Sequence, residues 1–144
     1  MSTSKKVSIF IVDDDELYLR VLEMELSENN DYTISKFVTG EQCLEFLPQK
    51  PDIIVLDYYL NGIEKKALNG LETLSIIKSV YPDMPVIMLS AQDKIEVAVN
   101  CMKLQAFEYI VKSETAFARL HNAIFTILHF KKMERTLSWY MEKL

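Results

Sequence analysis

Several apolar stretches of this chain end in side chains that can do chemistry. The run Val7–Val12 leads directly into three consecutive aspartates, Asp13 to Asp15, and a second run ends at Asp57. Adjacent carboxylates repel one another, so their clustering needs a reason. Asp15 can cap a following helix, because acidic residues are favourable near a helix N-terminus. Asp13 and Asp14 together with Asp57 could hold a hard divalent cation such as Mg²⁺, which prefers oxygen ligands.

Two further runs end in a hydroxyl and in an ammonium group. Residues 85–89 lead into Ser90, and residues 107–111 lead into Lys112. A serine hydroxyl can donate a hydrogen bond to a phosphoryl oxygen, and a lysine supplies a positive charge for another. A carboxylate such as Asp57 can act as a nucleophile toward phosphorus and form an aspartyl phosphate. Charge neutralisation and in-line positioning are most of what phosphoryl transfer needs, so this set of side chains suits that reaction.

Each of these residues alone has a simpler interpretation. An aspartate after a buried strand commonly caps or turns the chain, and a serine or lysine in that position is commonly a turn or a solvated cap. Only a joint arrangement on one edge of one sheet favours the chemical interpretation. That arrangement depends on the order of the strands and helices.

Strands and helices alternate five times along the predicted structure. Strands are expected at residues 7–12, 32–38, 52–57, 85–89 and 107–111. Helices are expected at residues 16–28, at 40–47 with Pro48 as its end, at 70–81, at 93–104, and after Ser113 as an N-cap. The alternation predicts parallel βαβ units with helices on both faces of the sheet. Right-handed crossovers then favour a flavodoxin-like, doubly wound α/β fold with strand order 2-1-3-4-5, whose polar strand ends share one edge.

Length and composition fit one globular domain. The chain has 144 residues, 49% of them hydrophobic and 26% charged. A net charge of −5 argues against a surface that binds nucleic acid directly. Cys43 and Cys101 lack the spacing of a metal or redox site, so we expect reduced thiols in the core. The apolar stretch near the N-terminus is too short for a signal peptide core or a membrane span, so we expect a cytoplasmic location and no membrane contact.

The motifs around these strand ends resemble the receiver domain of two-component response regulators, over about residues 6–130. The matching pieces are Val12-Asp13-Asp14, Leu56-Asp57, Ser90-Ala91, Ala106-Phe107-Glu108-Tyr109 and Val111-Lys112. Each piece alone is weakly specific, whereas all of them in order are specific. The resemblance implies that Asp57 accepts a phosphoryl group from a histidine kinase or a phosphotransfer protein. It also implies no enzymatic activity beyond the chain's own phosphorylation and dephosphorylation.

The resemblance implies a Mg²⁺ site as well. Asp13 and Asp14 would be the acid pair around the ion, and Asp14 and Asp57 would be direct ligands. The backbone carbonyl of Tyr59, two residues beyond the acceptor, would be a further ligand. The ion would screen the charge of Asp57 as the phosphoryl group approaches.

The resemblance further implies a conformational switch. Ser90 would be the switch hydroxyl, Tyr109 the switch aromatic, and Lys112 the family's lysine beside the phosphoryl group. Phosphate would draw Ser90 toward it, and Tyr109 would turn into the space vacated. This would change the surface formed by the fourth helix, the fifth strand and the fifth helix. In physical terms, phosphate would stabilise a minor conformer that is already present.

The loop after Asp57 departs from the family's pattern. Receivers usually carry a proline four residues past the acceptor and a glycine four beyond that, where this chain has Asn61 and Lys65. Gly70 comes five residues later than expected, so the loop of residues 58–69 carries an insertion. The insertion could be a lid, a partner contact or a tolerated extension.

Two positions near the fifth strand also differ from the family. Ser113 follows Lys112 where receivers usually have a proline, which affects the shape of the loop but not the charge of the lysine. Gln105 stands where a glycine is common. None of these differences removes a reacting group.

Residues 131–144 extend the last helix beyond the receiver-like region. Met133, Leu137, Tyr140 and Leu144 repeat at helical spacing without an intervening glycine or proline, so one long helix is expected. The extension could be a coiled-coil seam, a flap folded onto the domain, or a linker to an output module. A homodimer through this helix, or through the fourth helix, fifth strand and fifth helix, is a hypothesis.

Two other functions compete with the phosphoacceptor interpretation. A Mg²⁺-dependent phosphohydrolase with an aspartate nucleophile would want a second aspartate two residues after Asp57, where this chain has Tyr59. A receiver-fold binding module regulated without phosphorylation would be expected to lack one of the acids, the hydroxyl or the lysine, and the chain keeps them all. A flavin or nucleotide binder would want a glycine- or serine-rich phosphate loop, and the chain has three glycines.

Overall fold

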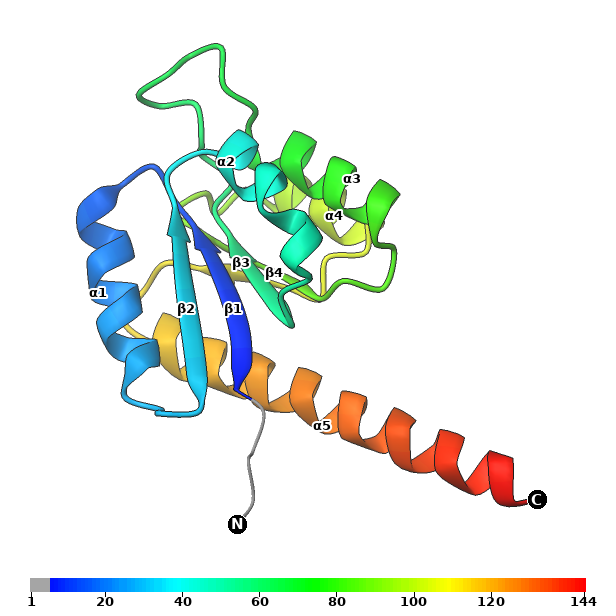
Figure 1. Ribbon diagram of the computed structural model, residues 1–144. Helices are drawn as coiled ribbons and strands as arrows, with labels where there is room; N and C mark the ends of the chain where they lie inside the picture. Colours follow the sequence, from blue (N-terminus) through cyan, green and yellow to red (C-terminus); the bar gives the residue numbers. More distant parts are fainter. Residues whose placement is uncertain (1–5) are drawn as a thin grey trace.

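Five parallel strands form the centre of the protein, and helices cover both faces of the sheet (Figure 1). The computed structural model describes residues 6–144. The strands are β1 (Val7–Val12), β2 (Tyr32–Phe37), β3 (Ile53–Leu56), β4 (Val86–Ser90) and β5 (Glu108–Val111). Their order across the sheet is β2-β1-β3-β4-β5, and every neighbouring pair is parallel. The predicted doubly wound α/β fold and its strand order are therefore confirmed.

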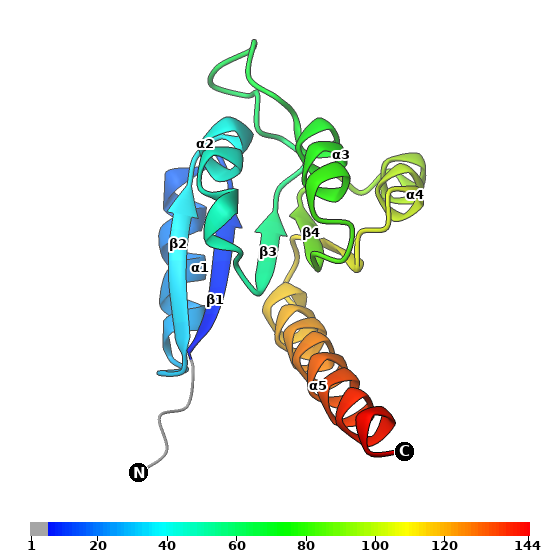
Figure 2. The ribbon, with the colours of Figure 1, turned by 45° about the vertical axis from the view of Figure 1, so that its right-hand side comes forward.

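The helices form a layer on each side of the sheet. They are α1 (Glu16–Ser27), α2 (Gly40–Glu45), α3 (Gly70–Val80), α4 (Ile95–Lys103) and α5 (Ala116–Lys143), with a short 3-10 turn at Leu47–Gln49. The helices α1 and α5 pack on one face, and α2, α3 and α4 pack on the other (Figure 2). In β1, Ile9 and Ile11 face the first layer, whereas Phe10 and Val12 face the second. A strand buried on both faces has no polar side, which explains the continuous apolar sequence from Ile9 to Val12.

Two residues that were predicted to bound helices do not do so. Pro48 lies inside the 3-10 turn instead of ending α2, because proline is tolerated in the first turn of a helix. Ser113 is not the N-cap of α5. Its carbonyl accepts the Ala116 N–H at 3.1 Å, and its side chain meets the Thr115 hydroxyl. The turn closed in this way delays the start of the helix to Ala116.

The last helix runs without a break from Ala116 to Lys143, as predicted. Leu120 and Ile124 bury its first half against the sheet, whereas its final turns stand away from the domain (Figures 1 and 2). The alternative of a flap folded back onto the domain is therefore wrong. Among the helices of residues 6–144, α5 included, none combines the length and apolar character that crossing a bilayer requires.

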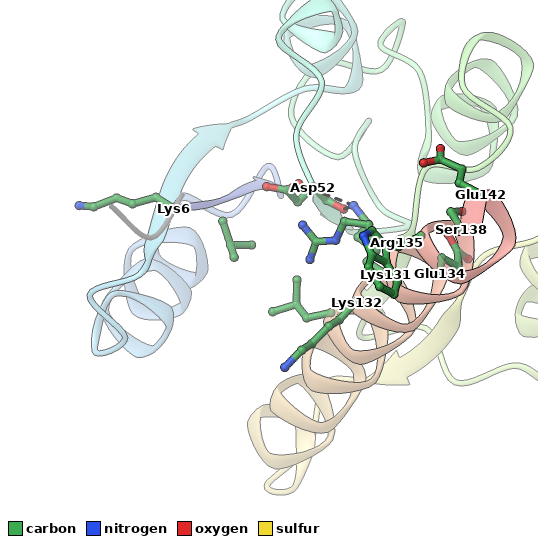
Figure 3. Close-up of a pocket in the computed structure, with 11 residues that line it drawn as sticks. Lys6, Asp52, Lys131, Lys132, Glu134, Arg135, Ser138 and Glu142 are labelled. Carbon is green, nitrogen blue, oxygen red and sulfur yellow. Dashed lines mark hydrogen bonds and ion pairs between the residues drawn. The ribbon is translucent and has the colours of Figure 1, made fainter. Parts of the chain in front are cut away.

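A groove separates the far half of α5 from the amino-terminal ends of β1 and β3 (Figure 3). The Lys131 ammonium spans this groove and donates to the Asp52 carbonyl oxygen at 3.0 Å. Basic and acidic side chains both line it, including Arg135 and Glu134. The Lys131 bond across the groove attaches α5 to the sheet. Because the carboxyl ends of the strands lie at the opposite edge, this groove is separate from the polar strand ends.

Candidate functional site

The polar residues at the strand ends meet at the carboxyl edge of the sheet. Asp13 follows β1, Asp57 follows β3, Ser90 ends β4 and Lys112 follows β5. The Lys112 ammonium lies 2.7 Å from Asp13 Oδ2 and 3.6 Å from Asp57 Oδ2. Ser90 is fully buried, and its hydroxyl is close enough to Asp57 to influence the pKa of that carboxyl. The structure thus brings together a cation, two carboxylates and a hydroxyl from four strands.

Backbone contacts fix the position of Asp57. Its N–H donates to the Val12 carbonyl at 3.0 Å, which aligns the end of β3 with the end of β1. Gly70, the first residue of α3, lies directly behind it. A Cβ atom at Gly70 would be 2.2 Å from the Asp57 carbonyl oxygen, so only glycine allows the helix to approach so closely.

Burial makes Asp57 an unusual carboxyl group, since the residue is only 4% exposed. Burial raises the pKa of Asp57 from its ordinary value of 3.8 to about 7, and the charge of Asp13 acts in the same direction. Lys112, the Ser90 hydroxyl and the Tyr59 backbone lower it. Asp57 Oδ1 is buried and has no hydrogen-bond partner within residues 6–144. A buried oxygen without a partner costs free energy, so it marks a position suited to a cation or a proton.

Lys112 is held between acids and an aromatic ring. Its burial alone would lower its pKa, but the hydrogen bond to Asp13 and the charges of Asp57 and Asp13 outweigh burial and raise the pKa. Its ammonium also lies 4.0 Å from the centre of the Tyr18 ring. The lysine therefore remains charged at neutral pH and partly neutralises the acidic cluster.

Three carboxylates could hold a metal ion. One oxygen each from Asp13, Asp14 and Asp57 lie within 4.8 Å of one another. Both oxygens of Asp13 already accept hydrogen bonds, from the Asp15 N–H at 2.9 Å and from Lys112 at 2.7 Å. Among residues 6–144, Asp57 Oδ1 has no hydrogen-bond partner. Mg²⁺ needs one or two carboxylates and keeps several waters, so this donor set fits it, with Asp14 and Asp57 better placed than Asp13 for direct contact.

The structure connects the predicted switch residues through Gln92, which sequence reasoning missed. The Tyr109 hydroxyl donates to the Gln92 carbonyl at 2.7 Å, and the Gln92 N–H donates to Ser90 Oγ at 3.2 Å. The Gln92 side-chain amide donates to the Tyr59 hydroxyl. Its place two residues after Ser90 was the available signal. No sequence signal indicated that Tyr18 would lie beside Lys112, because the spacing of Tyr18 places it on the apolar face of α1.

Other chemically active residues lie outside this site. His121 pairs with Glu25 at 2.7 Å, which joins α5 to α1, and His129 stacks on Phe125. Cys43 and Cys101 are unpaired and buried in the core. Burial raises the pKa of the Cys43 thiol to about 12 and that of Cys101 to about 11. Both thiols are therefore protonated and unreactive at neutral pH, as expected from the sequence.

Comparisons with known proteins identify a family. A response regulator from Rickettsia conorii, described as NtrX-like, is 37% identical over 108 residues, which cover 74% of this chain and 22% of that protein. A protein-glutamate methylesterase/protein-glutamine glutaminase from Clostridium acetobutylicum is 35% identical over 117 residues, which cover 78% of this chain and 32% of that protein. The receiver domain of NtrX from Brucella abortus has a similar crystal structure, with a TM-score of 0.73 and 27% identity, and the match covers 84% of this chain and 98% of that one.

These matches concern one part of larger proteins. The chain spans about a fifth to a third of the length of the two relatives compared by sequence. The sequence model of the response regulator receiver domain matches residues 9–125, which include every polar residue of the site. The chain belongs to the response regulator receiver domain family of two-component signal transduction.

Proposed function

We propose that Asp57 is the phosphoacceptor, and that a histidine kinase or a phosphotransfer protein is the donor. The observation that carries the proposal is the position of the Lys112 ammonium between Asp13 and Asp57, 3.6 Å from the carboxylate that would react. A fixed cation at this place offsets the repulsion between the carboxylate and an incoming phosphoryl group.

The reaction moves a phosphoryl group from a histidine nitrogen of the donor to an oxygen of Asp57. The N–P bond breaks as the O–P bond forms, and the imidazole takes up a proton from solvent. Asp57 must be ionised to attack, and the charge of Lys112 favours that form. Ser90 can donate its hydroxyl hydrogen to a phosphoryl oxygen. Mg²⁺ held by Asp14 and Asp57 would neutralise charge on the phosphoryl oxygens.

The switch would act through Ser90 and its neighbours. When the Ser90 hydroxyl turns toward phosphate, it gives up the hydrogen bond from the Gln92 N–H. The carbonyl of the same Gln92 holds the Tyr109 hydroxyl, so a shift of this residue reaches β5 directly. Ile95, Val99 and Met102 expose apolar side chains on the neighbouring α4. A change at Tyr109 would therefore alter the α4–β5–α5 surface offered to a partner.

Phosphorylation by acetyl phosphate tests the assignment. Wild-type protein should gain the mass of one phosphoryl group in the presence of Mg²⁺ but not after chelation, and peptide mapping should place it on Asp57. Asp57→Asn should gain none, whereas Asp31→Asn, a change at an exposed aspartate, should behave as wild type. Mg²⁺-dependent labelling that persists in Asp57→Asn would contradict the proposal. Absence of labelling in the wild type would favour the binding module regulated without phosphorylation.

We also propose that the C-terminal helix associates with the same helix of a second copy. Its seam, Phe130, Met133, Leu137, Tyr140 and Leu144, follows the alternating three- and four-residue spacing of a coiled coil. Each of these side chains is more than half exposed. Two heptads bury little surface, so the expected dimer is weak.

A further inference from the structure

The insertion after Asp57 forms a closed loop that begins and ends at the same point. The Gly70 N–H donates to the Tyr58 carbonyl at 2.7 Å, so residues 59–69 leave the sheet and return to it. Leu60 and Ala67 are buried and anchor the two legs of the loop. Figure 1 shows the loop rising above the carboxyl edge of the sheet, the edge at which the polar strand ends meet. We refer to residues 59–69 as the strap.

The strap is fixed to the domain on both legs. The Gly62 N–H donates to Asp14 Oδ2 at 3.1 Å, across 48 residues of sequence. The Leu68 N–H donates to Glu41 Oε2 at 3.1 Å, which ties the returning leg to α2. A Cβ atom at Gly62 would lie 3.0 Å from the same Asp14 oxygen, which is tighter than ordinary contact. Gly62 does not have a positive φ, so this close approach is what favours glycine.

The Asp14 side chain depends on the Gly62 contact for its position more than the Asp13 and Asp57 side chains do. Lys112 contacts Asp13 and Asp57 but not Asp14. Within residues 6–144, the Gly62 N–H is the one hydrogen-bond donor recorded for the Asp14 side chain. A carboxylate has two oxygens, so one can accept from Gly62 while the other remains available to a cation.

We propose that Gly62 is a positioning residue for the cation site: the strap holds Asp14 beside Asp57 so that both carboxylates are placed before Mg²⁺ binds. The inference rests on the proposed function, because it assigns the cation to these two aspartates. A ligand that is already ordered loses less entropy on binding, and hydrogen bonds behind a metal ligand raise its affinity. By linkage, the cation must in turn stabilise the strap.

Calorimetric Mg²⁺ titration of the full 144-residue chain tests the inference. Gly62→Pro removes the N–H donor, and we expect it to weaken Mg²⁺ binding about tenfold, as loss of a hydrogen bond behind a metal ligand typically does. Ile63→Pro is the matched control, because within residues 6–144 the Ile63 N–H donates no hydrogen bond that proline would remove. Gly62→Ala keeps the donor but crowds Asp14, so it should bind Mg²⁺ more tightly than Gly62→Pro.

Hydrogen exchange gives a second measurement that does not depend on phosphorylation. The Gly62 amide of the wild type should exchange more slowly with Mg²⁺ than without it, since the cation and the strap stabilise each other. Equal Mg²⁺ affinity in wild type and Gly62→Pro, or exchange at Gly62 that Mg²⁺ does not change, would overturn the role of the strap and leave the proposed function intact. A wild type that binds no Mg²⁺ would overturn both.

Discussion

The Lys112 ammonium and the Asp13 carboxylate lie 2.7 Å apart, although 99 residues separate them in the sequence. This ion pair joins the end of β5 to the end of β1, across the two strands that lie between them in the sheet. Both groups are largely buried, so the pair is strongly oriented. It holds the positive charge of the lysine beside Asp57, where that charge lowers the pKa of the carboxyl group.

Removing the charge of Lys112 should slow phosphorylation of Asp57. Lys112 lowers the pKa of Asp57, so Lys112→Met should move that pKa above about 7 and leave less of the carboxylate ionised at neutral pH. We expect the rate of labelling by acetyl phosphate to fall about tenfold or more at pH 7, since hydrogen bonds to charged groups contribute about 1.5–3 kcal/mol. Part of the loss should be recovered at pH 8.5. Lys94→Met, at an exposed lysine, is the control, and an unchanged rate in Lys112→Met would contradict the role given to the lysine.

Asp57→Asn should stabilise the metal-free protein at alkaline pH. Folding raises the pKa of Asp57 from 3.8 to about 7, so the unfolded chain loses this proton first as pH increases. The free energy of unfolding therefore falls between about pH 4 and pH 7, and Asp57 opposes folding above that range. Asparagine carries no charge, so urea unfolding at pH 8 should show a gain on the order of 2 kcal/mol.

The pH dependence distinguishes this effect from general repacking. Most of the gain in Asp57→Asn should disappear at pH 4.5, where the wild-type carboxyl is protonated when folded. Asp31→Asn should change stability little at either pH. A variant less stable than wild type at pH 8 would show that the hydrogen bonds of Asp57 outweigh the cost of its burial.

Gln105→Gly should also stabilise the protein. Gln105 has a φ of 67°, in the left-handed region that glycine adopts without steric cost. Its N–H closes the turn after α4 by donating to the Met102 carbonyl at 2.9 Å. Relief of the left-handed strain, less the extra freedom of glycine in the unfolded chain, should add about 1 kcal/mol to the free energy of unfolding. Gln105→Ala, which keeps a Cβ atom, should not show this gain in thermal or urea unfolding.

The sequence predicted the sheet and its polar edge because both follow from periodic signals. The β3 run is apolar at every position, which only a strand buried on both faces requires, and polar residues follow directly at its end and at the ends of β1 and β5. Contacts between loops follow no such period. The bond from Gly62 to Asp14, and the bond from the Tyr109 hydroxyl to the Gln92 carbonyl, depend on how irregular segments meet in space. Sequence spacing contains no information about that meeting.

Helix ends show the same limit on a smaller scale. Asp15 caps α1 as expected, accepting from the Leu17 and Tyr18 N–H groups, because an aspartate directly before a helical pattern is a local signal. Ser113 gives a similar signal before α5, yet the following residues form a separate turn first. Whether Ser113 caps the helix or begins a turn depends on where the chain leaves β5, which is a property of the whole fold.

Charge placed in the seam of the C-terminal helix should abolish self-association. Leu137 is 64% exposed and occupies the middle of the seam, so in a dimer it would face its counterpart on the second copy. Sedimentation velocity of the wild type at high micromolar concentration should show a concentration-dependent monomer–dimer equilibrium. Leu137→Glu should remain monomeric, because burying two carboxylates side by side is unfavourable. Ser138→Glu adds the same charge one position away, outside the seam, and should associate as the wild type does. A wild type that is monomeric over the whole concentration range, or equal association in Leu137→Glu and Ser138→Glu, would rule out this interface.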